Sequence, residues 1–159
     1  MNPSSLFALR RILVLCEGNH CRSPIAEGLL RSSLGPEVVV ESAGLDALEG
    51  HPADAEAQRL MAERGLDISA HRGRQLTPDL ALAADLILVM DRAQKAACEL
   101  RIPSARGRVF LLGHWLPEPR QEIPDPFRRG PEAFRENLNH IDQSVTAWLP
   151  KLIPHPRPA

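Results

Sequence analysis

Residues 11–34 read RILVLCEGNHCRSPIAEGLLRSSL, and this stretch decides the fold. Residues 12–15 are continuously apolar, which is typical of a parallel strand that is buried on both faces. A polar loop follows at 16–23. Ser23-Pro24 then predicts a helix start, because Ser supplies an N-cap oxygen and Pro fits the first helical position. The apolar residues of this helix share one side until Gly35-Pro36 ends it, so the stretch predicts a strand, a loop and a helix.

The same alternation continues outward along the chain. Further strands are expected at 38–40, ending in Ser42-Ala43-Gly44, at 85–90 and at 109–112, with helices at about 53–64, from Thr77-Pro78, at 92–100 and at 131–152. A Pro-rich loop separates the last strand from the last helix at 113–130. This order predicts a single α/β domain with a four-stranded parallel sheet flanked by helices on both faces. Residues 11–153 form the expected domain, with a flexible leader at 1–10 and a Pro-rich tail at 154–159.

Composition limits the classes of protein to which the chain can belong. Its 159 residues are 43% hydrophobic and 25% charged, which fits one folded domain and excludes disorder. The net charge of −1 gives no electrostatic footprint for nucleic acid, and no apolar run is long enough to span a membrane. Three cysteines cannot all pair, so we expect reduced thiols and a cytoplasmic location. We expect a monomer or weak dimer.

The loop between the first strand and its helix carries the chemistry. Cys16 and Arg22 are separated by five residues, Ser23 follows directly, and Gly18 lies between them. Such a loop can curl around one oxyanion with its N–H groups inward, and the helix N-terminus adds partial positive charge. Arg22 can grip two oxygens of a phosphoryl group, while Cys16 is placed as a thiolate nucleophile and Ser23 can donate to its sulfur. The simpler alternative makes Cys16 a buried apolar residue and Arg22 a surface residue.

A thiolate nucleophile also needs a proton donor for the leaving alkoxide. Asp125 lies between Pro124 and Pro126 in the long loop, and these prolines restrict the backbone of a carboxylate that must reach over a pocket. A solvated Pro-Asp-Pro turn is an equally good account of the spacing. The histidines that could donate instead are His20, His51, His71 and His114.

The segment CEGNHCRSPIAE at 16–27 resembles the signature of the low-molecular-weight protein tyrosine phosphatases. Ser42-Ala43-Gly44, His71-Arg72 and Asp125-Pro126 recur in the family's order, so the resemblance spans about 11–152. The resemblance implies that Cys16 becomes phosphocysteine, that Arg22 binds the phosphoryl group, and that Asp125 is first general acid and then general base. We expect no cofactor and no metal.

The resemblance also assigns the rest of the phosphate loop. It implies that Asn19, Ser42 and His71 hold the loop in shape, and that Cys21 can form a reversible disulfide with Cys16. Inorganic phosphate, vanadate or another oxyanion is the expected active-site ligand. The implied phosphate-loop residues are Glu17, Gly18, Asn19, His20, Cys21 and Ser23.

Segments 113–115 and 123–128 are similar to the bacterial branch of the family, whose members typically act on tyrosine autokinases. A phosphotyrosine protein, and a tyrosine autokinase in particular, is therefore the expected partner. Leu48 and Phe127 are the expected apolar walls for a phenyl ring, and Phe127 stands where many relatives have Tyr. The chain has no Tyr, which excludes regulation by phosphorylation of its own tyrosines.

Three other functions are compatible with parts of this pattern. An arsenate reductase resembles the same loop but needs a relay of further thiols, and the chain has only Cys98 outside the loop. A phosphate-binding module without turnover would need neither Cys16 nor Asp125. Metal-dependent hydrolysis finds no support in the spacing of the six histidines.

Overall fold

Four parallel strands form one sheet in the computed structural model, which describes residues 9–153. Their order is β2-β1-β3-β4, as predicted for this α/β class. The chain passes from β1 to β2 on one side and then crosses back to β3 on the other side of β1. The end of β1 therefore lies at the topological switch point, where ligands of such sheets bind. The strands are β1 (Arg11–Cys16), β2 (Val39–Gly44), β3 (Leu86–Val89) and β4 (Val109–Leu111).

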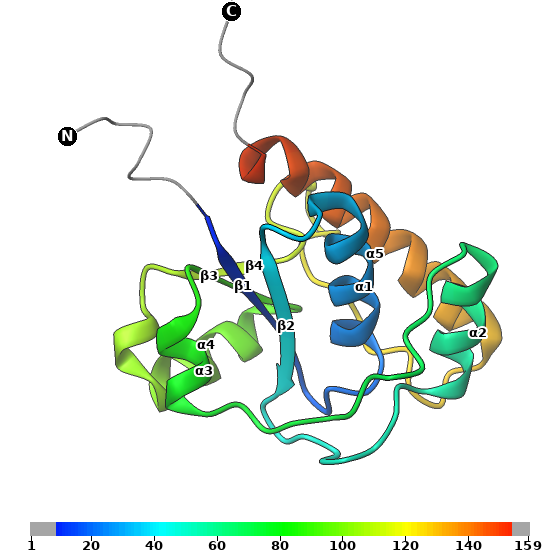
Figure 1. The fold of residues 1–159 in the computed structure, drawn as a ribbon, viewed down its shortest axis with the longest axis horizontal. Helices are drawn as coiled ribbons and strands as arrows, with labels where there is room; N and C mark the ends of the chain where they lie inside the picture. Colours follow the sequence, from blue (N-terminus) through cyan, green and yellow to red (C-terminus); the bar gives the residue numbers. More distant parts are fainter. Residues whose placement is uncertain (1–8, 154–159) are drawn as a thin grey trace, which may run out of the picture.

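Helices cover both faces of this sheet (Figure 1). The apolar residues of α1 (Arg22–Leu34), α2 (Ala55–Glu63) and α5 (Pro131–Leu152) join one core cluster. Those of α3 (Pro78–Ala83), α4 (Arg92–Arg101) and the 3-10 helix η2 (Pro103–Ala105) join a second cluster. The predicted sheet with helices on both faces is confirmed.

Strand β1 explains why there are two cores. Ile12 and Val14 pack into the cluster with α1 and α5, whereas Leu13 and Leu15 pack into the cluster with α3 and α4. Successive side chains of a strand point to opposite faces, so a continuously apolar run serves both cores at once. The central position of β1 fixes the place where its C-terminal end, and the loop that follows, meet solvent.

The start of α1 differs from the prediction. The helix begins at Arg22, Cys21 occupies the N-cap position, and no side chain caps it. The predicted Ser23 cap is wrong, because the Ser23 hydroxyl is buried and lies 3.0 Å from the Cys16 sulfur instead. The predicted Thr77 cap of α3 is confirmed, since its Oγ1 accepts from Leu80 N–H at 3.3 Å.

The N-terminal end of the described chain is held beside the start of β3. The backbone N–H groups of Arg10 and Arg11 both donate to the Asp85 carboxylate at 2.9 Å. The tail predicted at 154–159 and residues 1–8 of the predicted leader lie outside the described residues. Within 9–153, no helix combines the length and the apolar character needed to cross a membrane.

Candidate active site

The loop at 17–21 joins β1 to α1, and its carbonyl groups all point away from the centre of the loop, toward neighbouring segments of the protein. Those of Cys16, Glu17 and Gly18 accept N–H groups from the segment that follows β2, at 2.8–3.1 Å. A Cβ on Gly44, at the end of β2, would lie 2.8 Å from the Glu17 oxygen, so the loop can approach so closely only because this residue is glycine. Further along, the Asn19 carbonyl contacts His71 Nε2 at 2.8 Å. The carbonyls of residues 20 and 21 accept the N–H groups of residues 54 and 25.

The N–H groups of the same loop have the opposite arrangement. Within the described part of the chain, the N–H groups of residues 17–22 donate to no protein acceptor. Consecutive free amides at the N-terminus of a helix form a binding site for an anion, and the α1 macrodipole adds to it. The loop is therefore built to hold a tetrahedral oxyanion.

Asn19 holds the loop in this shape from behind. Its backbone lies in the left-handed region, with φ 53°, and its side chain is 1% exposed. Its Nδ2 donates to Ser23 Oγ at 2.8 Å and to Ser42 Oγ at 2.9 Å, while its Oδ1 accepts from Arg74 N–H at 2.9 Å. Each polar atom of this side chain therefore has a partner.

Cys16 lies at the end of β1 with its sulfur 3.0 Å from Ser23 Oγ. Because Ser23 Oγ accepts from Asn19, its own proton is free to point at the sulfur. The hydroxyl can thus donate to the Cys16 sulfur.

Arg22 connects the loop to the Pro-rich segment after β4. Its guanidinium is buried, and Nη1 donates to the Ile123 carbonyl at 2.7 Å. Nη2 lies 3.8 Å from Asp125 Oδ2, while Asp125 Oδ1 accepts from Phe127 N–H at 3.0 Å. The Asp125 side chain is half exposed, so it can exchange protons with solvent. On helix α5, Asn137 fixes the same segment by donating to the Pro124 carbonyl at 2.8 Å.

These groups surround one cavity of about 190 Å³. It contains Cys16, Arg22 and Asp125 together with the expected walls Leu48 and Phe127, which are both 42% exposed. A larger cavity of about 730 Å³ lies over Glu27, Arg31 and neighbouring residues and includes none of the groups just named. The smaller cavity is the candidate active site, because it combines the Cys16 thiol, the free amides and the Asp125 carboxylate. Its remaining lining residues are Glu17, Gly18, His20, Cys21 and Asp46.

Most of the other histidines and cysteines considered in the sequence do not line the cavity. Among the histidines considered as donors, His20 lines it, whereas His51, His71 and His114 do not. Cys98 is fully buried in the core cluster beneath α3 and α4, on the sheet face opposite α1, and burial raises the pKa of its thiol. It is not placed to relay electrons to the loop.

Comparison with known proteins decides the family. A sequence profile described as low molecular weight phosphotyrosine protein phosphatase matches residues 11–155. The chain belongs to this family. The predicted family and the predicted enzyme class, a cysteine-dependent phosphatase, are confirmed, and the arsenate reductase alternative is not favoured.

Relatives of this phosphatase share most of its length. It is 50% identical over 144 residues to the probable low molecular weight protein-tyrosine-phosphatase EpsP of Ralstonia nicotianae, with 91% of this chain and 97% of EpsP covered. Its structure is similar to Wzb from Escherichia coli K30 in complex with sulphate, with a TM-score of 0.86, 43% identity, and 91% and 99% of the two chains covered. Vibrio vulnificus Wzb, in complex with benzylphosphonate, gives a TM-score of 0.85 and 42% identity with the same coverage.

Three residues of the phosphatase site were missed in the sequence. Arg74 supports the loop through its bond to Asn19 and through Nε, which donates to the Ser42 carbonyl at 2.9 Å. Asp46 lines the cavity, and Asp54 contacts His20 at its edge. No local motif marks these residues, since each reaches the loop only through the fold.

Proposed function

We propose that this phosphatase hydrolyses phosphotyrosine in proteins, with Cys16 as nucleophile, Arg22 as the phosphoryl-binding residue and Asp125 as general acid and base. The observation that carries the proposal is the row of free amides at 17–22, which shares one cavity with the Cys16 sulfur and the Arg22 guanidinium. This arrangement offers a dianionic phosphoryl group donors in place of water, directly beside a nucleophile.

Binding of the phosphoryl group uses the loop and Arg22 together. Its oxygens accept from the amides of 17–22, at the N-terminus of α1. The bond from Arg22 Nη1 to Ile123 fixes the guanidinium plane and leaves donors on Nε and Nη2 for two of the oxygens. A lysine could not reproduce this geometry.

In the first chemical step, the Cys16 thiolate attacks phosphorus as the bond to the tyrosine oxygen breaks. The S–P bond forms with the sulfur electron pair, and protonated Asp125 gives its proton to the leaving phenolate. The Ser23 hydroxyl, 3.0 Å from the sulfur, stabilises the negative charge on the free thiolate before attack. Tyrosine leaves and phosphocysteine remains.

In the second step, water attacks phosphorus and the S–P bond breaks. The Asp125 carboxylate takes a proton from this water, which restores the acid form, and the electron pair returns to Cys16. Ser23 again stabilises the sulfur as it leaves. One tyrosine and one inorganic phosphate are produced from one phosphotyrosine and one water.

The walls of the cavity favour an aromatic phosphate. Leu48 and Phe127 border the opening with apolar surface, and the Vibrio vulnificus relative binds benzylphosphonate, which carries a phenyl ring. A protein with an exposed phosphotyrosine can place its ring between these walls. We expect a bacterial tyrosine autokinase to be the physiological substrate.

Trapping the intermediate tests this mechanism. Acid quenching during turnover of p-nitrophenyl phosphate should yield a protein that carries one phosphoryl group on Cys16, located by peptide mass spectrometry. Cys16→Ser should abolish turnover and still bind vanadate or phosphate, and EDTA should not abolish the parent activity. Full activity of Cys16→Ser, or complete loss with EDTA, would overturn the proposal.

Paired peptides test the substrate class. A phosphotyrosine peptide should be hydrolysed much faster than the same sequence with phosphoserine, because the shorter side chain cannot bring its phosphate to the bottom of the cavity while the walls hold its carbon atoms. Comparable rates would remove the aromatic preference. A tyrosine autokinase phosphorylated in vitro should lose its phosphate to the parent protein and not to Cys16→Ser.

A further inference from the structure

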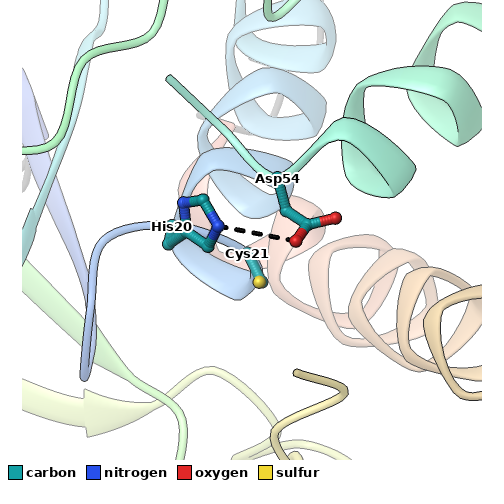
Figure 2. A group of neighbouring side chains, drawn as sticks. All are labelled: His20, Cys21 and Asp54. Atoms are coloured by element: carbon teal, nitrogen blue, oxygen red, sulfur yellow. Dashed lines mark ion pairs between the residues drawn. The ribbon is translucent and has the colours of Figure 1, made fainter. Parts of the chain in front are cut away.

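Three side chains with different donor atoms meet at the edge of the active-site cavity. Figure 2 shows His20 and Cys21 from the phosphate loop beside Asp54, which precedes α2. One nitrogen, one sulfur and one oxygen atom of these residues all lie within 4.8 Å of one another. Neither the phosphoryl-transfer steps proposed above nor the support of the loop by Asn19 uses the three donor atoms of this cluster.

The histidine is oriented so that Nε2 faces the carboxylate. His20 Nδ1 lies 3.1 Å from the Pro52 carbonyl, to which it can only donate, and Nε2 lies 3.4 Å from Asp54 Oδ2. With Nδ1 donating to this carbonyl, Nε2 and the Asp54 oxygen approach favourably only around a positive charge, which a proton or a metal ion can supply. A histidine that donates its other N–H to a backbone carbonyl is the usual arrangement at metal sites.

The carboxylate is held as firmly as the ring. Asp54 caps α2, with Oδ1 accepting from Glu56 N–H at 2.9 Å, and its own N–H donates to the His20 carbonyl at 2.9 Å. Its second oxygen, Oδ2, is thereby turned toward His20 (Figure 2). Two of the three donor atoms are thus in place without a bound ion.

The distances suit zinc. Bonds of about 2.0 Å to nitrogen and oxygen at tetrahedral angles separate two ligands by about 3.3 Å, close to the 3.4 Å between His20 Nε2 and Asp54 Oδ2. A thiolate with a bond of about 2.3 Å would lie about 3.6 Å from the ring nitrogen, so the Cys21 sulfur, now within 4.8 Å of both other atoms, completes the set by moving to that distance. Histidine, cysteine and carboxylate together favour zinc over magnesium or calcium, which prefer oxygen.

The charges around Cys21 favour a cation as well. Burial raises the pKa of the Cys21 thiol, and the negative charges of Asp54, Cys16 and Asp125 raise it further, opposed by Arg22. The carboxylates of Asp54 and Asp125 would attract a cation at this sulfur, and the Arg22 guanidinium would repel it. A metal ion bound to the sulfur would displace the thiol proton, which passes to solvent.

We propose that His20 Nε2, Cys21 Sγ and Asp54 Oδ2 bind a zinc ion, with water in the fourth position, and that the bound ion reversibly inhibits the phosphatase. The inhibition, unlike the binding, rests on the proposed role of Asp125. Cys21 and Asp125 line the same cavity, so an ion on the Cys21 sulfur stabilises the Asp125 carboxylate, which is the form that cannot protonate a leaving group. The ion also restrains the loop immediately before Arg22.

Cobalt(II) gives a direct readout of the site, because a tetrahedral thiolate complex has a sulfur-to-metal charge-transfer band and intense visible bands. The probe is cobalt chloride added to EDTA-stripped Cys16→Ser protein, so that the nucleophile cannot supply the thiolate. This variant should show the bands, and zinc should bleach them. Adding Cys21→Ser to it should abolish the charge-transfer band.

Asp54→Asn tests the carboxylate without disturbing the helix, because Asn is an equally good N-cap. In the Cys16→Ser background it should weaken zinc binding by about 10-fold or more, which is the least expected for loss of a ligand. Asp46→Asn is the matched control, since it removes a carboxylate from the wall of the same cavity but not from the cluster. It should leave zinc affinity within about twofold of its parent, as screening of one solvent-accessible charge allows.

Inhibition is measured in the protein with Cys16 intact, against the zinc-free rate of each variant. Zinc should inhibit hydrolysis of p-nitrophenyl phosphate, EDTA should restore it, and Asp54→Asn should raise the inhibitory concentration by the same factor as it weakens binding. Bands that require Cys16 and survive loss of Cys21 would place the metal on the nucleophile and overturn the proposal. So would unchanged zinc affinity in Asp54→Asn, or zinc binding without inhibition. Cobalt bands in a protein that proves to have no phosphatase activity would instead refute the proposed function and leave the metal site standing.

Discussion

Replacing Asn19 separates the two ways in which this residue shapes the phosphate loop. Its side chain makes three hydrogen bonds, to Ser23, Ser42 and the backbone of Arg74, and its backbone is left-handed with φ 53°. Asn19→Gly removes the bonds and tolerates the backbone, whereas Asn19→Ala removes the bonds and adds backbone strain.

The expected losses follow from these contacts. At about 1 kcal/mol for each buried hydrogen bond, Asn19→Gly should lower the free energy of unfolding by about 3 kcal/mol. Asn19→Ala should lower it by about 1 kcal/mol more, because a Cβ disfavours positive φ. In both variants the Ser23 hydroxyl loses the donor that orients it toward Cys16, and kcat should fall by about 100-fold, as for a misplaced catalytic group.

Urea unfolding followed by tryptophan fluorescence, with kcat for p-nitrophenyl phosphate, measures both effects. Asn139→Ala is the matched control: the same side chain is lost from an exposed position of α5, where it accepts one bond from Arg64, and stability should change by no more than about 0.5 kcal/mol. If Asn19→Ala were as stable as Asn19→Gly, the left-handed backbone would not be under strain. If neither variant lost more than the control, the bonds of Asn19 would not hold the loop.

Asp125→Asn should lower kcat by about 100-fold or more for alkyl phosphates, whose leaving groups need a proton, and much less for p-nitrophenyl phosphate; equal losses would remove Asp125 as the acid. Burial acts to raise the pKa of Glu41, but hydrogen bonds from Arg11 and Arg74 outweigh it and hold the pKa below its usual range. The Glu41 carboxylate therefore stabilises the folded state above its unfolded pKa, and this stability is lost as the pH falls through the folded pKa. Glu41→Gln should accordingly be less stable than the parent at neutral pH and equally stable in acid. A difference in stability that persists in urea titrations at acid pH would contradict this. Cys98→Ala should keep kcat within about twofold, because this thiol lies on the far face of the sheet, and loss of turnover would revive a thiol relay.

Much of the architecture could be predicted because its signals are local. The apolar run at 12–15 predicts a strand that is buried on both faces, and Thr77-Pro78 predicts a helix start that the structure confirms. Cys16 and Arg22 had to lie close together, because a tight loop between a strand and a helix brings residues six apart to the same anion. Spacing and capping depend only on nearby residues, so they can be read without knowing the fold.

The partners that complete the site were decided by tertiary structure. Ser23 is a residue type that often caps helices, but here its hydroxyl contacts the Cys16 sulfur and accepts from Asn19, whose side chain also donates to Ser42 on β2. Arg22 donates to the carbonyl of Ile123, which lies in the loop after the fourth strand. Asp54 meets His20 and Cys21 only because α2 packs on the same face of the sheet as α1. The chemical groups of a residue can be read from the sequence. Its hydrogen-bond partners in this site depend on where segments distant in sequence lie, and those segments take their positions only when the sheet and its two cores form.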